Sequence, residues 1–288
     1  MQDSRKRAED EIDLVQAVDA GPERMNGGSA LRQVQPVLAA TDSMTRDNVL
    51  AGCPRKTWMP DPAAMLSFGG SEPAHGTEVF RALRSRLCQL QGKSPLKSIL
   101  ITSALPREGR SFVALNLAQA MALQPESRVL LIDADLRAPR LHSALGTSPS
   151  PGFSEYLLQE AEEFGIMQKG SVENLFFIPS GRSVTGPTEL VANGRLKSLI
   201  DRVEPLFDWI IVDSPPAVPV SDACLLANYC DGVLMVVRSS STPFDVVRKA
   251  RERFREESLV GVVLNEIGVS TISESRSSLS NLGSEVRS

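Results

Sequence analysis

The stretch ILITSALPREGRSFVALNLA, residues 99–118, joins an apolar run to a helical pattern through a short polar loop. The apolar run at residues 97–103 predicts a buried strand, and residues 111–123 show helical periodicity. A loop that follows a strand and opens a helix suits an anion, because backbone N–H groups and the helix N-terminus attract negative charge. We therefore expect a phosphate-binding loop at residues 104–111.

This loop departs from the regular phosphate-binding pattern G-x-x-x-x-G-K-[ST] at two positions. Ala104 stands at the first glycine and Arg110 at the lysine, whereas Ser111 occupies the position of the hydroxyl that ligates Mg²⁺. Arginine keeps the charge, but its planar guanidinium meets a phosphate differently from a compact ammonium. Taken alone, the loop could equally be an ordinary strand-to-helix turn capped by Ser111.

Further apolar runs alternate with helical segments along the chain. The pattern predicts strands at residues 97–103, 128–133, 175–178, 209–213, 232–237 and 260–265, and helices at 77–90, 111–123, 153–158, 188–206 and 243–257. Near-continuous apolar strands between amphipathic helices indicate an α/β fold with a mostly parallel central sheet covered by helices on both faces. With the loop, this is the architecture of a P-loop NTPase.

Carboxylates close two of the predicted strands. Asp133 and Asp135 leave one strand end, where either could hold a magnesium-bound water or accept a proton from an attacking hydroxyl. Asp213 ends another apolar run, which is the Walker B arrangement. Each could singly be a turn aspartate, but loop and carboxylates in this order predict a nucleotide site. Asn265, closing the last strand, could hydrogen-bond a base or serve as a turn residue.

Composition excludes several other classes of protein. Lys plus Arg is 31 and Asp plus Glu is 35, a net charge of −4 that gives no electrostatic case for nucleic-acid binding. The 4 cysteines form no C-x-x-C and the histidines number 2, which argues against a zinc cluster and for free thiols. Neither a signal-peptide core nor a run long enough to span a membrane is present, so we expect a cytoplasmic protein.

The motifs together resemble those of the bacterial tyrosine kinases of the CpsD/CapB type, the kinases of capsule and exopolysaccharide export. The matching runs cover roughly residues 78–265 and are ILITSALPREGRSFVALNLA, VLLIDADLRAPRLH, FIPSGR, FDWIIVDSPPAVPVSDA, CDGVLMVVRS and GVVLN. The resemblance implies a protein-tyrosine kinase that uses ATP and Mg²⁺ and regulates polysaccharide biosynthesis. It also implies a membrane chain-length-determinant protein as activator, which would bring the chain to the inner face of the plasma membrane.

The resemblance assigns roles to residues of this chain. Catalysis would involve Arg110 on the phosphates and Asp133 or Asp135 on the acceptor hydroxyl; Mg²⁺ would be held by Ser111, Asp135 and Asp213. The residues expected at the nucleotide are Pro106, Arg107, Glu108, Gly109, Arg110, Ser111, Phe112 and Asn265. Glu78, Arg81 and Arg84 match an E-x-x-R-x-x-R motif on the helix before the first strand, which implies a homo-oligomer through that helix.

Three departures from the family pattern leave a second hypothesis open. Arg110 replaces the usual lysine and Arg107 a usual glycine, and the only tyrosines, Tyr156 and Tyr229, fall inside the predicted domain rather than in a terminal cluster. The alternative is a nucleotide-sensing regulatory subunit with weak catalysis. The related partition ATPases carry a signature lysine five residues before the loop lysine; Leu105 at that position disfavours them.

The chain divides into three parts by composition. Residues 1–74 lack sustained periodicity and are expected to form a mobile leader. Residues 75–268 form the P-loop kinase or ATPase domain. Residues 269–288 are rich in serine and poor in apolar residues, and we expect a disordered tail.

Overall fold

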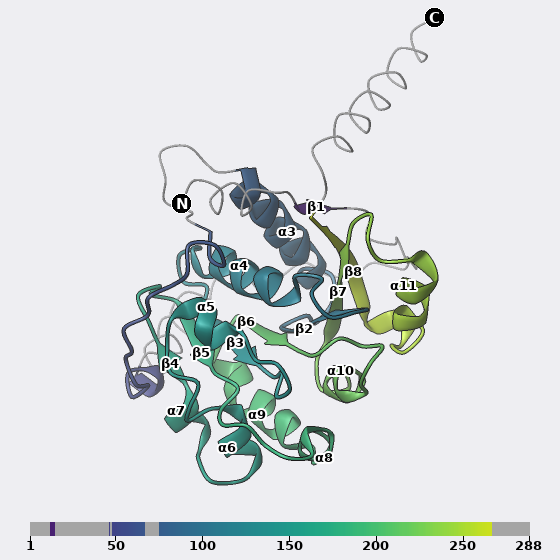
Figure 1. Ribbon diagram of the computed structural model, residues 1–288. Helices are drawn as coiled ribbons and strands as arrows, with labels where there is room; N and C mark the ends of the chain where they lie inside the picture. The colour runs from purple at the N-terminus through teal and green to yellow at the C-terminus, as the bar shows by residue number, and fades with distance from the viewer. Residues whose placement is uncertain (1–11, 15–45, 47, 67–74, 267–288) are drawn as a thin grey trace, which may run out of the picture.

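A computed structural model describes residues 12–14, 46, 48–66 and 75–266 of the chain. Its centre is a sheet with the strand order β1-β8-β7-β2-β6-β3-β5-β4 (Figure 1). The inner strands are parallel, and the outer strands β1 and β4 pair antiparallel with β8 and β5. The strands are β1 (Ile12–Leu14), β2 (Ser98–Ser103), β3 (Val129–Asp133), β4 (Gln168–Lys169), β5 (Leu175–Ile178), β6 (Trp209–Asp213), β7 (Gly232–Arg238) and β8 (Leu259–Asn265).

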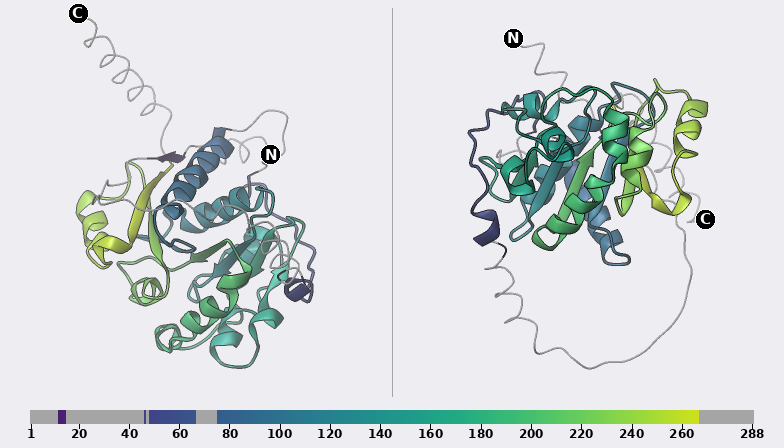
Figure 2. Two further views of the ribbon diagram at one scale, coloured as in Figure 1. Left: turned by 180° about the vertical axis from the view of Figure 1, so that it is seen from behind. Right: turned by 90° about the horizontal axis from the view of Figure 1, so that it is seen from below.

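Helices cover both faces of this sheet, which confirms the expected fold class (Figures 1 and 2). Alternate residues of β2 belong to the two layers: Ile99 and Ile101 share a core cluster with residues of α3 and α4, whereas Leu100 belongs to the cluster that includes residues of α6 and α9. None of the described helices is both long and apolar enough to cross a membrane. The helices are α3 (His75–Gln91), α4 (Arg110–Ala122), α5 (Leu141–Leu145), α6 (Phe153–Leu157), α7 (Glu163–Ile166), α8 (Pro187–Ala192), α9 (Arg195–Val203), α10 (Asp222–Ala227) and α11 (Phe244–Arg251), with 3₁₀ turns η1 (Glu204–Leu206) and η2 (Glu256–Ser258).

Two long helical predictions are interrupted. The run expected at residues 188–206 breaks at Gly194, whose φ of 77° is left-handed and ends the helical geometry. The run at residues 243–257 stops at Arg251, and Phe244, the first residue of this helix, is 80% exposed. The helices α5, α7 and α10 were not predicted, because elements of four to six residues are too short to show a period.

The segment at residues 48–66, which we name the strap, runs along the outside of the sheet (Figure 1). Trp58 of the strap is 5% exposed, with its ring edge-on to Phe177 at 6.3 Å between centroids. The indole lies on Gly170, where an added Cβ would come within 1.9 Å of the ring. The strap therefore belongs to the folded unit, contrary to the expected mobile leader through residue 74. Extended chain held by isolated anchors shows no period, which is why composition missed it.

The remainder of the expected leader, apart from β1 and Arg46, lies outside the described residues, as does the expected tail at 269–288.

Backbone hydrogen bonds attach the strap at two places. The N–H of Lys56 donates to the carbonyl of Lys169 at 2.9 Å, and the N–H of Asp61 donates to the carbonyl of Ala144 at 2.9 Å. These bonds bring the end of the strap to the carboxyl edge of the sheet, beside α5.

Candidate nucleotide site

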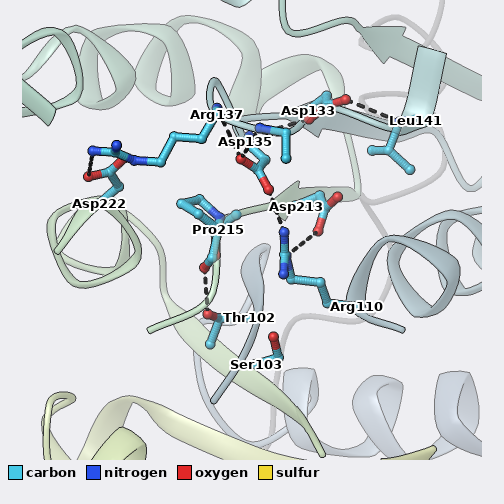
Figure 3. Close-up of polar contacts among 12 residues, drawn as sticks. Thr102, Ser103, Arg110, Asp133, Asp135, Arg137, Leu141, Asp213, Pro215 and Asp222 are labelled. Carbon is cyan, nitrogen blue, oxygen red and sulfur yellow. Dashed lines mark hydrogen bonds and ion pairs between the residues drawn. The ribbon is translucent and has the colours of Figure 1, made fainter. Parts of the chain in front are cut away.

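Three neighbouring strands bring their polar ends together at the centre of the sheet (Figure 3). Asp133 at the end of β3 and Asp213 at the end of β6 are register partners, and Ser103 ends β2 on the other side of β6. All three are buried. Adjacent parallel strands end at the same edge, so residues far apart in sequence form one site.

The loop between β2 and α4 has two residues in left-handed backbone geometry. Gly109 has φ of 87°, and a Cβ there would lie 1.8 Å from the side-chain nitrogen of Asn265. Arg107 has φ of 66°, a conformation that costs a residue with a side chain about 1–2 kcal/mol. This explains physically why a glycine would suit position 107. The alternating geometry turns the loop into the start of α4, whose first residue is Arg110.

Two of the expected nucleotide contacts turn away from the cavity. The Asn265 side chain donates to the backbone carbonyl of Glu108 at 2.9 Å, a contact that is neither the base contact nor the turn role expected for Asn265. The carboxylate of Glu108 is 2% exposed and accepts the N–H of Leu105 at 2.7 Å. In this structure both side chains bond to the backbone of the loop, and neither of them lines the cavity.

Arg110 joins the loop to the carboxylates. Its guanidinium forms an ion pair with Asp135, and its Nε lies 3.9 Å from Oδ1 of Asp213 (Figure 3). The other Asp135 oxygen accepts the N–H groups of Arg137 at 3.1 Å and Ala138 at 3.0 Å. The carboxylate is therefore fixed in the turn after β3 with one oxygen toward the loop.

The buried carboxylates perturb one another. Burial raises the pKa of Asp213 to about 7; Arg110 and the Ser111 hydroxyl oppose this, and Asp135 adds to it. Burial, with Asp213 and Asp135 nearby, raises the pKa of Asp133 well above its usual range against two backbone N–H donors. Negative charge at this edge thus needs a cation, and Arg110 supplies one.

The residues present fit a bound Mg²⁺. Neither buried oxygen of Asp213 accepts a hydrogen bond of normal geometry within the described part of the chain, although Ser111 is near enough to lower its pKa. No group of three or more His, Cys, Asp or Glu gathers as a metal cage among the described residues. Mg²⁺ needs no such cage, because it takes one or two carboxylates and completes its shell with water and phosphate oxygens.

A cavity of about 820 Å³ opens beside the loop. Such a volume suits a nucleotide-sized ligand. Its walls come from the loop with the start of α4, from the segment before and within α5, and from the strap; the lining residues include Pro106, Arg107, Gly109, Arg110, Ser111, Phe112, Arg140, Ser143, Asp61 and Ala64. Sequence reasoning missed the strap and α5 walls, and the one hint was Trp58, a large apolar residue in an otherwise unpatterned segment.

A second polar cluster adjoins the turn after β3. The guanidinium of Arg137 donates to the buried carboxylate of Asp222 at 2.8 and 3.2 Å (Figure 3). The hydroxyl of Thr188 donates to the same carboxylate at 2.7 Å. These bonds tie the turn to α8 and α10. The sequence assigns no role to these three residues, because the bonds join segments 34 and 85 residues apart in the chain.

The charged residues on α3 make contacts within this chain. Glu78 and Arg81 form an ion pair within the helix, and Arg84 donates to the backbone carbonyl of Ala120 at 2.8 Å. Of the two tyrosines, Tyr156 is buried in the core and Tyr229 is half-buried. The Tyr156 side chain therefore packs in the core and is not presented at the surface.

This chain is similar to known proteins in sequence and in fold. Residues 107–246 match a family model described as an AAA domain. The tyrosine-protein kinase YwqD of Bacillus subtilis is 34% identical over 200 residues, which cover 69% of this chain and 84% of YwqD. The tyrosine-protein kinase CpsD of Streptococcus agalactiae is 33% identical over 67% of this chain and 83% of its own. The kinase domain of the Escherichia coli tyrosine kinase ETK superposes with a TM-score of 0.64 at 30% identity, covering 68% of this chain and 77% of that domain.

Proposed function

The chain belongs to the CpsD-type bacterial tyrosine kinases, and on that premise we propose that it transfers the γ-phosphoryl group of ATP to tyrosine hydroxyls in the making and export of capsular polysaccharide or exopolysaccharide. One observation carries the proposal: the loop before α4, the Asp133–Asp135 turn and Asp213 meet at one edge of the sheet. Phosphoryl transfer relies almost wholly on positioning and charge, which this arrangement provides.

The loop and the residues that face it are suited to bind the phosphates and the metal. We propose that the loop N–H groups and Arg110 bind the phosphates, that Ser111 and Asp213 hold Mg²⁺ directly, and that Asp135 holds it through a bound water. The metal, when bound, neutralises charge on the phosphate oxygens. Arg110 must leave Asp135 to reach a phosphate, so nucleotide binding and release of this carboxylate are one event.

Asp135 is the better of the two candidates for the acceptor proton. Both oxygens of Asp133 accept backbone N–H groups, from Asp135 at 3.3 Å and Leu141 at 3.2 Å, and burial raises its pKa. A carboxyl group whose two oxygens are both occupied by backbone donors is poorly placed to accept a proton from tyrosine. Asp135 presents one oxygen toward the loop, where it can take a tyrosine proton once Arg110 has moved.

Partners follow from the same premise. We propose that a membrane chain-length-determinant protein activates the chain at the inner face of the plasma membrane, and that copies associate through α3 with Glu78, Arg81 and Arg84. Exposed charge beside a buried apolar stripe on one helix supports that interface. The strap and residues 75–268 would act as one kinase unit.

A nucleotide-sensing subunit with weak transfer is the second candidate, favoured by the Arg110–Asp135 ion pair. Intact-mass measurement after incubation with MgATP, with and without the membrane partner, separates the two. A kinase gains mass in steps of one phosphoryl group on itself or on an added tyrosine peptide. Nucleotide binding with no such gain under either condition would leave only the sensing role.

A further inference from the structure

Glu108 lies in the phosphate loop but faces the protein interior. Its Oε2 accepts the N–H of Leu105 at 2.7 Å, three residues earlier in the same loop. Its Oε1 accepts the hydroxyl of Thr242 and, at a longer 3.4 Å, the N–H of Arg238. One carboxylate therefore closes the loop on itself and ties it to the connection between β7 and α11.

The backbone of Glu108 is fastened as well. Its carbonyl accepts the side-chain amide of Asn265 at 2.9 Å, and the carbonyl of Asn265 accepts the N–H of Ser239 at 2.8 Å. The ends of β7 and β8 are thus joined to the loop through this residue. Gly109, next in sequence, packs against the same amide with no room for a side chain.

The loop needs such support because its shape is costly. Arg107 and Gly109, on either side of Glu108, both have positive φ, at 66° and 87°. An unfavourable backbone conformation persists where surrounding contacts over-determine it. The cavity is lined by Arg107 and Gly109 but not by Glu108, so this carboxylate is placed to shape the loop and not to meet phosphate or metal.

We propose that Glu108 is a positioning residue, whose carboxylate sets the phosphate loop in its binding shape before nucleotide arrives and couples it to residues 238–242. The proposal deepens the proposed function and rests on it. Because loop amides are aimed in advance, less ordering is required on binding. Changes in the β7–α11 connection therefore reach the phosphates through this one side chain.

The first test compares nucleotide affinities by calorimetry with MgADP. Glu108→Ala should weaken binding about 10- to 100-fold, the range for losing hydrogen bonds to a charged group. Glu108→Gln keeps an oxygen for Leu105 and an amide for the Thr242 oxygen, and should recover most of the loss. Thr242→Val should weaken binding about 3- to 10-fold, since one of the bonds is removed.

Glu155 provides a matched control. It is 7% exposed and accepts the N–H of Gly152 at 2.8 Å and the hydroxyl of Ser150 at 2.7 Å, around α6 and away from the loop. Glu155→Ala should lower thermal stability and leave MgADP affinity at the wild-type value. Equal affinity of Glu108→Ala and wild type would overturn the proposal, and so would equal losses from Glu108→Ala and Glu155→Ala.

A second test needs no nucleotide. Hydrogen exchange at the amides of residues 105–110 in the ligand-free protein should be faster in Glu108→Ala than in Glu155→Ala or wild type. Unchanged exchange would show that the carboxylate does not shape the loop, whatever the affinity data say. Failure of the wild type to bind nucleotide would instead count against the proposed function, while the exchange result still decides the role of Glu108.

Discussion

Arg110 and Asp135 are ion-paired across the gap between the phosphate loop and the turn after β3. The pair is buried, and Asp213 lies beside it at 3.9 Å from the Arg110 Nε. The side chain proposed to bind phosphate therefore occupies the carboxylate proposed to take the tyrosine proton. On the proposed function nucleotide competes with this contact, which makes Arg110 the first residue to change.

Replacing Arg110 with lysine should raise ATP turnover. A lysine keeps the charge but cannot reproduce the planar fork that engages Asp135 and approaches Asp213. Misplacing a charge by about 1 Å can cost on the order of 10²-fold, so we expect a gain within that range. Steady-state phosphate release measures it, with Arg110→Ala as the variant that should lose turnover. A fall in turnover for Arg110→Lys would identify the arginine as an adapted phosphate clamp.

Nucleotide binding should depend on Mg²⁺ through Ser111 and Asp213. Removing the hydroxyl in Ser111→Ala or the carboxylate in Asp213→Ala takes away a proposed metal ligand, and each should weaken MgATP by about 10-fold or more. Titration calorimetry with Mg²⁺ and with a chelator checks this. Ser94→Ala, an exposed serine, is the control and should bind as wild type does. If the wild type binds ATP with the same affinity in Mg²⁺ and in chelator, the metal assignment is wrong.

The metal-free protein should lose stability as the pH rises toward 7. Burial raises the pKa of Asp213 from 3.8 to about 7, so the folded state holds a proton that the unfolded state releases. The stabilisation is complete below about pH 4 and is lost as the pH passes through about 7. Denaturant unfolding between these values should show the decline, and Asp213→Asn should reduce it, with the remainder due to the raised pKa of Asp133. The exposed Asp245→Asn should leave the slope as it is; a wild-type slope of opposite sign contradicts the argument.

Trp58 should anchor the strap. Trp58→Ala empties a buried site against Phe177 and Gly170 and should lower the free energy of unfolding by about 3–5 kcal/mol. Because the same strap supplies Asp61 and Ala64 to the cavity wall, MgATP affinity should fall too. The neighbouring Met59 is 76% exposed, so Met59→Ala should change neither quantity. Equal stability of the two variants would place the strap outside the folded unit.

Self-association should depend on α3. Arg81→Ala with Arg84→Ala removes the charged stripe, and light scattering should show that oligomers present in the wild type dissociate. Arg84 also bonds the Ala120 carbonyl, so the double variant should be slightly less stable. Arg86→Ala, an exposed change on the same helix, serves as the control. A wild type that stays monomeric at high concentration with nucleotide and partner present would exclude this interface.

How far the sequence predicts the site depends on the range of each interaction. The strands β2, β3 and β6 follow from apolar runs, because a strand buried on both faces has no polar side. Asp133 and Asp213 could be placed together since parallel strands end at one edge. The direction in which a side chain points cannot be predicted in this way. Glu108 accepts a hydrogen bond from Thr242, 134 residues away, and no residue near Glu108 in the sequence indicates this contact.

By itself, then, the sequence determined the parallel α/β sheet, the position of the phosphate loop and the carboxylates that face it, because these depend on burial patterns and chain order alone. Only the tertiary structure decided that the strap packs through Trp58, that Arg110 is held by Asp135, and that Asn265 and Glu108 brace the loop from behind. These are contacts between distant segments, and each depends on backbone angles and on space left by other elements. Local composition predicts neither the backbone angles nor the space that other elements leave.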